Sequence, residues 1–258
     1  MNIYLATILA GMRPENVQTL VEVGKPKYLL NTFFEGERAC EKVLKIAGSP
    51  DCFLLDSGAF SFMSGAECSE NIIEGYAERY ADFIIQHKIT QYFEIDVDTI
   101  FGLPFAERIR HKLESKTGVQ CIPVWHKNRG VEYWKRMCDE YKYIAIGGLV
   151  FHVKQQEWPL IHKMVDYAAF KGVKVHGLGF TKTKLLENWN WYSVDSSSWK
   201  TSAIRGSIKH NFNGKYIEST PIKKQGFKMD QRLLAMYNGI EWCKYQKYME
   251  MRGVFKFF

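Results

Sequence analysis

Eight short apolar runs recur along the chain and predict its architecture. They span residues 2–9, 27–34, 52–60, 92–98, 120–126, 143–150, 173–180 and 191–199. Most are almost continuously apolar, which is typical of strands buried on both faces of a parallel sheet. Helical patterns lie between most of them, so the repeats predict an α/β fold, a (β/α)8 TIM barrel. A doubly wound open sheet is the alternative.

The helical patterns begin and end at recognisable residues. The clearest covers residues 69–88, with Ser69 as its N-cap and a continuous apolar face. Residues 204–229 break the strand–helix rhythm and predict a loop or hairpin insertion, and residues 230–251 predict a closing helix. No Pro/Gly/Ser-rich linker divides the chain. We therefore expect a single domain over residues 1–258, with residues 200–258 as a basic insertion and closing helix within it.

The positive charge is concentrated at one end of the chain. Residues 200–258 carry 12 Lys and Arg against 4 Asp and Glu, whereas residues 1–199 carry 23 against 24. A localised basic region is the electrostatic footprint of a polyanion-binding protein, although a solvated helix and loop surface has the same composition. The candidate phosphate contacts are Lys200, Arg205, Lys209, Lys223 and Lys224.

Composition argues against several other classes of protein. No two of the six cysteines lie within four residues of each other, so neither a zinc ribbon nor a CxxC redox pair is expected. No apolar run approaches the roughly 18 residues of a membrane span, and the first residues do not resemble a signal peptide. We expect a cytoplasmic protein that binds no membrane.

Polar residues and glycines gather where the predicted strands end. In chain order these candidates are Asp56, Ser57, Asp96, Asp98, His126, Gly147, Gly148, Leu149, Gly177 and Asp195. Barrel enzymes place their chemistry at the carboxyl ends of the strands. We therefore expect three or four carboxylates to face one pocket.

Several carboxylates in one pocket suit glycosyl transfer. Their pKa values are pushed apart, so that one acts as a nucleophile and another as an acid or base. Glycines allow backbone N–H groups to approach a planar ligand. Each residue also has a structural interpretation: Asp56 as a turn cap, Asp96 or Asp98 as a helix cap, and His126 as a hydrogen-bonded rim residue. Phe60, Phe62, Trp125 and Phe180 are candidates for stacking on a base or for the core.

Four segments together resemble a known family. "LLDSGAFSF", "IAIGGL", "VHGLGFTKTKLLE" and "YSVDSSSW" are similar, in order and over roughly residues 52–199, to motifs of the tRNA-guanine transglycosylases. The resemblance implies that Asp195 is the nucleophile that attacks C1′ of the ribose. It implies that Asp56 contacts the base and transfers protons, within a motif that includes Ser57, and that Asp96, or alternatively Asp98, reads the guanine edge.

The same resemblance implies the remaining contacts. The backbone of Gly148 and Leu149 falls where the family contacts the base, and His126 lies near the family's glutamine on the fifth strand. No cofactor is implied. The family's zinc motif, CxCxxC with a distant His, is missing here, and the chain is short. In this it is similar to the phage DNA 7-deazaguanine transglycosylases, which implies DNA and a free 7-deazaguanine base such as preQ0 as partners, with tRNA as the alternative polymer.

Two other classes stay open at the sequence level. One is a glycoside hydrolase that uses Asp56 and Asp195 as its carboxylate pair, which the basic end of the chain disfavours. The other is a non-catalytic nucleic-acid-binding barrel in which the acids only cap helices. The sequence does not predict the identity of the inserted base, the strand state of the target or the oligomeric state.

Overall fold

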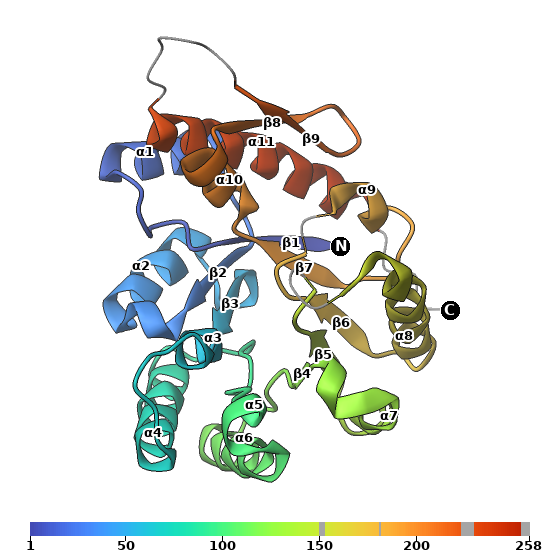
Figure 1. Ribbon diagram of the computed structural model, residues 1–258. Helices are drawn as coiled ribbons and strands as arrows, with labels where there is room; N and C mark the ends of the chain where they lie inside the picture. The colour runs from blue at the N-terminus through green and yellow to red at the C-terminus, as the bar shows by residue number, and fades with distance from the viewer. Residues whose placement is uncertain (150–152, 181, 223–229, 254–258) are drawn as a thin grey trace.

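A curled parallel sheet forms the centre of the computed structural model, which describes residues 1–149, 153–180, 182–222 and 230–253 (Figure 1). Within that part of the chain the sheet has seven strands in the order β3-β2-β1-β7-β6-β5-β4. Their bounds are β1 (Asn2–Ala6), β2 (Leu29–Thr32), β3 (Phe53–Asp56), β4 (Val124–Trp125), β5 (Tyr143–Ile146), β6 (Lys174–Gly177) and β7 (Ser193–Ser196). All the pairings are parallel, as the continuous apolar runs predict.

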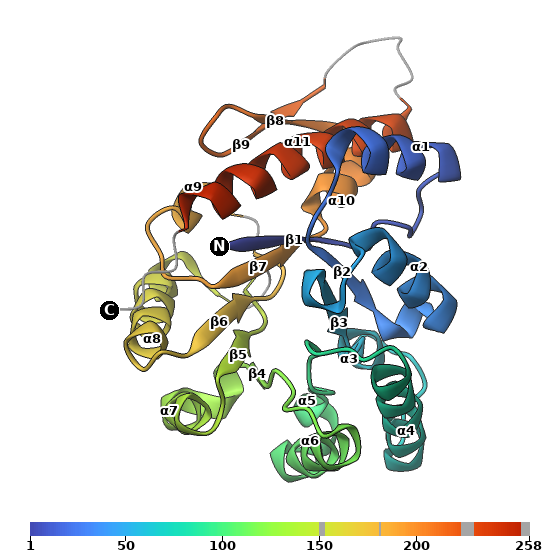
Figure 2. The same cartoon turned by 180° about the vertical axis from the view of Figure 1, so that it is seen from behind.

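Helices surround the outer face of the sheet, as both views show (Figures 1 and 2). They are α1 (Pro14–Thr19), α2 (Glu37–Ala47), α3 (Ala59–Met63), α4 (Glu70–Gln86), α5 (Asp98–Phe101), α6 (Leu103–Thr117), α7 (Gly130–Glu140), α8 (Trp158–Phe170), α9 (Thr183–Leu186), α10 (Ser198–Gly206) and α11 (Gln231–Arg252). A π-helical turn covers Leu20–Gly24, and 3-10 turns cover Phe33–Glu35, Pro50–Cys52, Lys127–Arg129 and Gln155–Glu157. Ser69 caps α4 as expected, since its Oγ accepts a hydrogen bond from the Ile72 N–H at 3.3 Å.

Side chains alternate between the two faces of the sheet and form two separate apolar clusters. The larger cluster lies between the sheet and the helices and includes Leu55 and Val194. The smaller one lies on the concave face and joins Leu54 of β3 to Val124 of β4, although these strands are the two edges of the sheet. The sheet is therefore curled far enough for side chains from its two edges to pack together.

The expected strand at residues 92–98 is not a strand, and the described sheet is not a closed eight-stranded barrel. Tyr92 makes only an isolated parallel bridge to Leu55 of β3, and Phe93 makes another to Ile122. Beyond Phe93, the carboxylate of Glu94 accepts the Val124 N–H at 2.7 Å, where a strand would offer a backbone carbonyl. The backbone then turns, because the Val97 N–H donates to the carbonyl of residue 95 at 3.0 Å, and α5 begins.

A buried ionic network holds this irregular segment. Glu94 pairs with Arg129 at 2.7 Å and with Arg110 at 3.2 Å, and Arg129 also pairs with Asp98 at 2.6 Å. These side chains are almost fully buried, at 1% exposure or less. Arg129 therefore holds the chain two residues before and two residues after Asp96, which fixes the backbone that carries Asp96.

The chain after β7 contains the predicted hairpin and the predicted closing helix. Strands β8 (Ile208–Phe212) and β9 (Ile217–Pro221) pair in an antiparallel hairpin, which lies alongside α11 in both views (Figures 1 and 2). Helix α11 packs on α10 and reaches the start of the sheet. There the side-chain amide of Gln246 donates to the carbonyl of Ile3 at 2.6 Å and to that of Tyr28 at 3.0 Å.

Candidate active site

Three carboxylates gather at the carboxyl ends of the strands, on the concave face. Asp56 is the last residue of β3, Asp195 lies near the end of β7, and Asp96 follows the bridged segment. Asp195 is in register with Tyr4, a member of the concave-face cluster, so its side chain faces the same way. The charges of Asp96 and Asp195 both act on Asp56. Asp56 thus interacts electrostatically with both other acids, which agrees with the expected convergence of carboxylates at this edge of the sheet. That they face one pocket stays a prediction.

Asp56 has the most perturbed ionisation of the three. Burial raises the pKa of its carboxyl to about 7, and the neighbouring charges of Asp96 and Asp195 act in the same direction. Hydrogen bonds from the Thr32 side chain and the Gly58 backbone only partly offset this. Gly58 has a φ of 77°, and a Cβ there would lie 2.6 Å from Thr32 Oγ1, so glycine is required. A carboxyl with this pKa exchanges protons near neutral pH.

Asp96 forms a close pair with His126. His126 Nε2 lies 2.6 Å from Asp96 Oδ2, and both side chains are largely buried. Burial alone would lower the pKa of His126, but the hydrogen bond to Asp96 and its negative charge outweigh burial and raise it. The pair therefore presents an imidazole and a carboxylate together, from different segments, at the rim of the concave face.

Asp98 is held by other partners, so Asp96 is the better candidate of the two acids, and its role in reading a base stays a prediction. Its Oδ1 accepts from Arg129 at 2.6 Å and its Oδ2 accepts from Asn128 at 3.0 Å. Burial would raise the pKa of Asp98, but the hydrogen bond and charge of Arg129 dominate and lower it. Asp98 is thus a partner in the buried network, and Asp96 is the acid that faces the other carboxylates.

One oxygen of Asp195 is held by two donors. Its Oδ1 accepts the backbone N–H of Gly179 at 2.8 Å and lies 3.1 Å from Nε2 of His176. Its other oxygen, Oδ2, accepts no hydrogen bond from the residues that the structure describes. The side chain of Asp195 is 10% exposed. The carboxylate is therefore fixed in orientation with one oxygen left for a ligand.

Sequence reasoning missed His176. It lies inside β6, fully buried, and its Nδ1 is 2.7 Å from Ser193 Oγ. Functional residues were expected at the ends of strands, whereas His176 comes one residue before the glycine that ends β6. The signal that could have revealed it is a lone imidazole at an inward position of an otherwise apolar run, in the strand next to the one that carries Asp195.

The glycines near the site are explained by packing rather than by close approach of a ligand. A Cβ on Gly147 would lie 2.4 Å from Cε1 of His126, and one on Gly177 would lie 3.2 Å from both Trp191 and Val194. Gly177 thus leaves room for core side chains, and its expected role in binding stays a prediction. Gly148 has a φ of 70°, and the Leu149 side chain is buried in the larger cluster. Their expected backbone contacts with a base stay predictions.

Ser57 and three of the four candidate aromatic residues also have structural partners. Ser57 is buried, with its Oγ accepting from the Ala59 N–H at 3.4 Å and its carbonyl accepting from the Tyr76 hydroxyl at 2.6 Å. Direct binding of a base by its side chain is therefore not supported. Three of the aromatic candidates are core residues, namely Phe62, Trp125 and Phe180, whereas Phe60 is 63% exposed.

The expected phosphate contacts separate into three groups. The prediction that Lys200 contacts phosphate is wrong, because Lys200 is buried. Its Nζ donates to the Thr7 carbonyl, the Thr7 hydroxyl and the Ala10 carbonyl at 2.8–2.9 Å. Burial lowers the pKa of Lys200 to about 8, so it secures the loop after β1 and does not face a polyanion. Arg205 and Lys209 are exposed. Lys223 and Lys224 lie outside the described residues.

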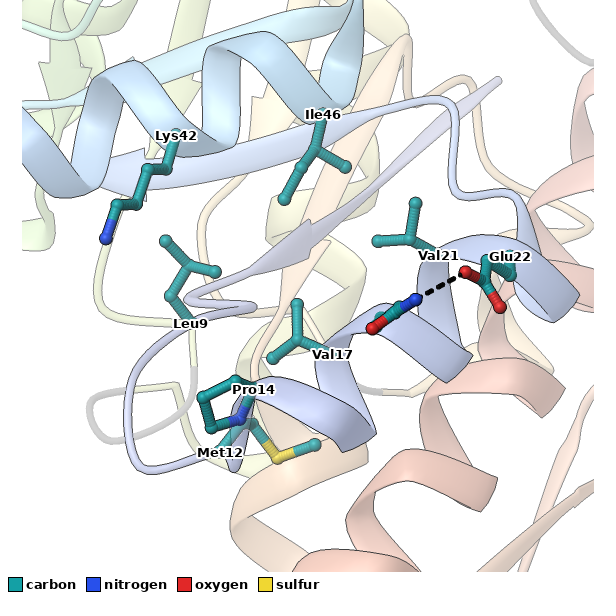
Figure 3. A pocket seen from close by; sticks show the side chains of 9 residues that line it. Leu9, Met12, Pro14, Val17, Val21, Glu22, Lys42 and Ile46 are labelled. Carbon is teal, nitrogen blue, oxygen red and sulfur yellow. Dashed lines mark hydrogen bonds between the residues drawn. The ribbon is translucent and has the colours of Figure 1, made fainter.

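A hollow lies away from the carboxylates, between α1 and α2 (Figure 3). It has a volume of about 510 Å³ and is lined mainly by apolar side chains, among them Leu9, Val17 and Ile46. At its edge the Gln18 amide donates to Glu22 at 2.8 Å. Chemistry requires convergent reactive groups, which are found at the carboxylates and not in this hollow.

The described residues form neither a metal site nor a membrane-spanning helix. No group of three His, Cys, Asp or Glu side chains is arranged to hold a metal ion. No helix in the described ranges is long and apolar enough to cross a membrane. Comparison with known proteins adds no assignment, because no protein-family model and no curated protein matches this sequence.

Proposed function

We propose that the protein is a glycosyltransferase that exchanges guanine in DNA for a free 7-deazaguanine, through a covalent glycosyl-aspartate intermediate. One observation carries the proposal: Asp56, Asp96 and Asp195 meet on the concave face, and Asp56 has a pKa raised to about 7 by burial and by the other two acids. An acid of raised pKa beside other carboxylates is the arrangement that double-displacement glycosyl transfer uses. The resemblance of four segments to guanine transglycosylases names the substrate.

Asp195 is the proposed nucleophile. Its Oδ2 forms a bond to C1′ of the target deoxyribose while the C1′–N9 bond of guanine breaks and the electron pair goes to the base. Asp56, in its acid form, supplies the proton that the departing guanine needs. In the second step Asp56 takes the proton from N9 of the incoming base, N9 attacks C1′, and Asp195 leaves as a carboxylate. Two displacements retain the configuration at C1′.

Asp96 and His126 are the proposed base-reading pair, with the backbone of Gly148 and Leu149 as further contacts. A carboxylate and an imidazole 2.6 Å apart offer an acceptor and a donor side by side, which suits the hydrogen-bonding edge of a purine. Phe60, exposed on α3 soon after Asp56, is the aromatic candidate for stacking on the base. In this proposal the curled sheet acts as a TIM-type barrel mouth, with residues 92–98 forming the remaining part of its wall.

DNA is the proposed polymer, and its target base must leave the helix. A glycosidic bond inside a duplex is unreachable, so the enzyme acts on a flipped or single-stranded nucleotide. The exposed Arg205 and Lys209, together with the basic residues outside the described ranges, are the proposed contacts to phosphate. The same contacts would serve tRNA, so the experiment must separate the two polymers.

Base exchange tests the proposal directly. Purified protein is incubated with radiolabelled guanine or preQ0 and, separately, with duplex DNA, single-stranded DNA and bulk tRNA. We expect label in DNA, and no label with Asp195→Ala. Asp82→Asn is the matched control, because Asp82 is an exposed acid on α4 that pairs with Lys116. Label in tRNA alone would mean that tRNA, and not DNA, is the substrate. Wild-type incorporation by Asp195→Ala would refute the assignment of Asp195 as the nucleophile.

A further inference from the structure

A series of buried hydrogen bonds leads from Tyr143 to Asp195, and each donor in it lies on the side away from Asp195. The hydroxyl of Tyr143 lies 2.5 Å from Ser193 Oγ, Ser193 Oγ lies 2.7 Å from His176 Nδ1, and His176 Nε2 lies 3.1 Å from Asp195 Oδ1. A carboxylate only accepts hydrogen bonds, so His176 must carry its proton on Nε2 to bond Asp195. Nδ1 then accepts from the Ser193 hydroxyl, whose oxygen accepts from Tyr143. Every donor in the chain points towards the carboxylate.

Packing prevents His176 from taking another orientation. Its imidazole is fully buried in the concave-face interior, with its ring centroid 5.1 Å from that of Phe93 and 6.0 Å from that of Tyr4. Strand register places it directly opposite Ser193, on the strand that also carries Asp195. A buried imidazole with one fixed tautomer, aimed at a single carboxylate oxygen, is how proteins orient a reactive group through its neighbour.

We propose that His176 is the positioning residue of the nucleophile: with the Gly179 N–H it holds Oδ1 of Asp195, leaves Oδ2 to attack C1′, and assists departure of Asp195 in the second displacement. This inference rests on the proposed transglycosylase function. When Oδ2 bonds to C1′, Oδ1 becomes the carbonyl oxygen of the glycosyl ester. The two donors on Oδ1 stabilise the charge that returns to the carboxylate when the incoming base attacks, as donors do at a developing oxyanion.

Two variants separate this role from simple packing. His176→Leu removes the donor, whereas His176→Gln can present a side-chain N–H to Asp195 in its place. For His176→Leu we expect kcat of exchange to fall about 10- to 100-fold, the range found when a residue that orients a reactive ligand is removed. KM for the free base should change little, and the fraction of enzyme trapped as the glycosyl-enzyme should rise, because the second displacement is slowed. His176→Gln should recover most of kcat.

Matched variants control for stability. His210 is another buried imidazole with two partners, Trp242 at 2.8 Å and Ser202 at 3.0 Å, and it has no contact with the site. His210→Leu should lower Tm as His176→Leu does but leave the trapped fraction unchanged. Ser193→Ala should shift kcat in the same direction as His176→Leu by a smaller factor, because Nδ1 of His176 then loses its hydrogen-bond donor and the imidazole is held less firmly.

A spectroscopic measurement keeps the inference separate from the proposed function. In protein labelled with 15N-histidine, the His176 signals, assigned by their loss in His176→Gln, should show the tautomer with the proton on Nε2. An Nδ1–H tautomer would overturn the inference even if exchange occurs. Wild-type kcat in His176→Leu, or equal losses in the Leu and Gln variants without extra trapped enzyme, would also overturn it. An Nε2–H tautomer in a protein that exchanges no base would uphold the hydrogen-bond chain and refute the transglycosylase function alone.

Discussion

A Cβ atom on Gly147 would lie 2.4 Å from Cε1 of His126 and 2.9 Å from its Nδ1. Glycine at the end of β5 therefore makes room for the imidazole that pairs with Asp96. The relationship links a small residue that follows β5 to the orientation of a candidate base-reading group that follows β4, and these two strands are neighbours in the sheet.

Gly147→Ala should displace His126 and weaken its pair with Asp96. We expect a loss of stability of about 1–3 kcal/mol, as for other overpacked sites, and a rise in KM for the free base. Denaturant unfolding and base-exchange kinetics measure the two effects. Gly75→Ala is the control: nothing lies within 4 Å of a Cβ there, and Gly75 is in helix α4, so that change should stabilise the protein slightly. An unchanged KM in Gly147→Ala would contradict the role of His126.

Asp56 should impose a pH dependence on stability. Its folded pKa of about 7 lies above the ordinary value of 3.8, so between these values the folded protein holds a proton that the unfolded chain has released. The contribution of Asp56 to stability therefore falls as pH rises from about 4 to about 7 and is constant above that. Asp56→Asn should remove this slope. Unfolding of both proteins across pH 4–9 measures it, and parallel curves would refute the raised pKa.

The buried network around Arg129 should be important for folding. Arg129→Met leaves Glu94 and Asp98 buried without their shared cation, and breaking one partner of such a pair costs about 3–5 kcal/mol. We expect a large drop in Tm at pH 7. Arg108→Met is the control, since Arg108 pairs with Glu70 and Glu74 on the surface and exposed pairs contribute little. Similar losses of Tm in the two variants would show that burial of the network does not determine its contribution to stability.

The basic residues should divide into structural and phosphate-binding classes. Arg205→Gln combined with Lys209→Gln should reduce the salt dependence of DNA binding, lowering the slope of log K against log salt by about 2. Lys200→Met should leave that slope unchanged and lower stability by about 1–3 kcal/mol, since three partly buried acceptors lose their donor. Fluorescence anisotropy over a salt titration, with thermal unfolding, checks both. A reduced slope in Lys200→Met would contradict its buried role.

The sequence predicted the sheet well where backbone pairing follows from local pattern. Seven of the eight apolar runs contain strands, and the meeting of Asp56 and Asp195 followed from the rule that parallel strands end at one edge. The predicted strand at residues 92–98 was wrong because the side chain of Glu94 accepts the hydrogen bond that a backbone carbonyl would accept in a strand. Its partner Arg129 lies 35 residues away. No local pattern encodes such a contact.

The errors at the site have the same physical origin. In the sequence, Lys200 resembles a surface charge. In the structure its side chain donates to the Thr7 carbonyl, almost two hundred residues earlier in the chain. The absence of a side chain at Gly177 is explained by Trp191, a residue from a later segment that packs against it. His176 reads as part of an apolar strand, and only the neighbouring strand shows that it faces Asp195.

If Asp195 is the nucleophile, it becomes covalently attached to the sugar, and this adduct can be trapped. Wild-type protein is incubated with a guanine-containing oligonucleotide without an incoming base, denatured and analysed by intact mass and peptide mapping. We expect an adduct on the peptide that contains residues 193–196, absent in Asp195→Ala and present in Asp82→Asn. An adduct at another residue, or base exchange that proceeds with no adduct under these conditions, would contradict it.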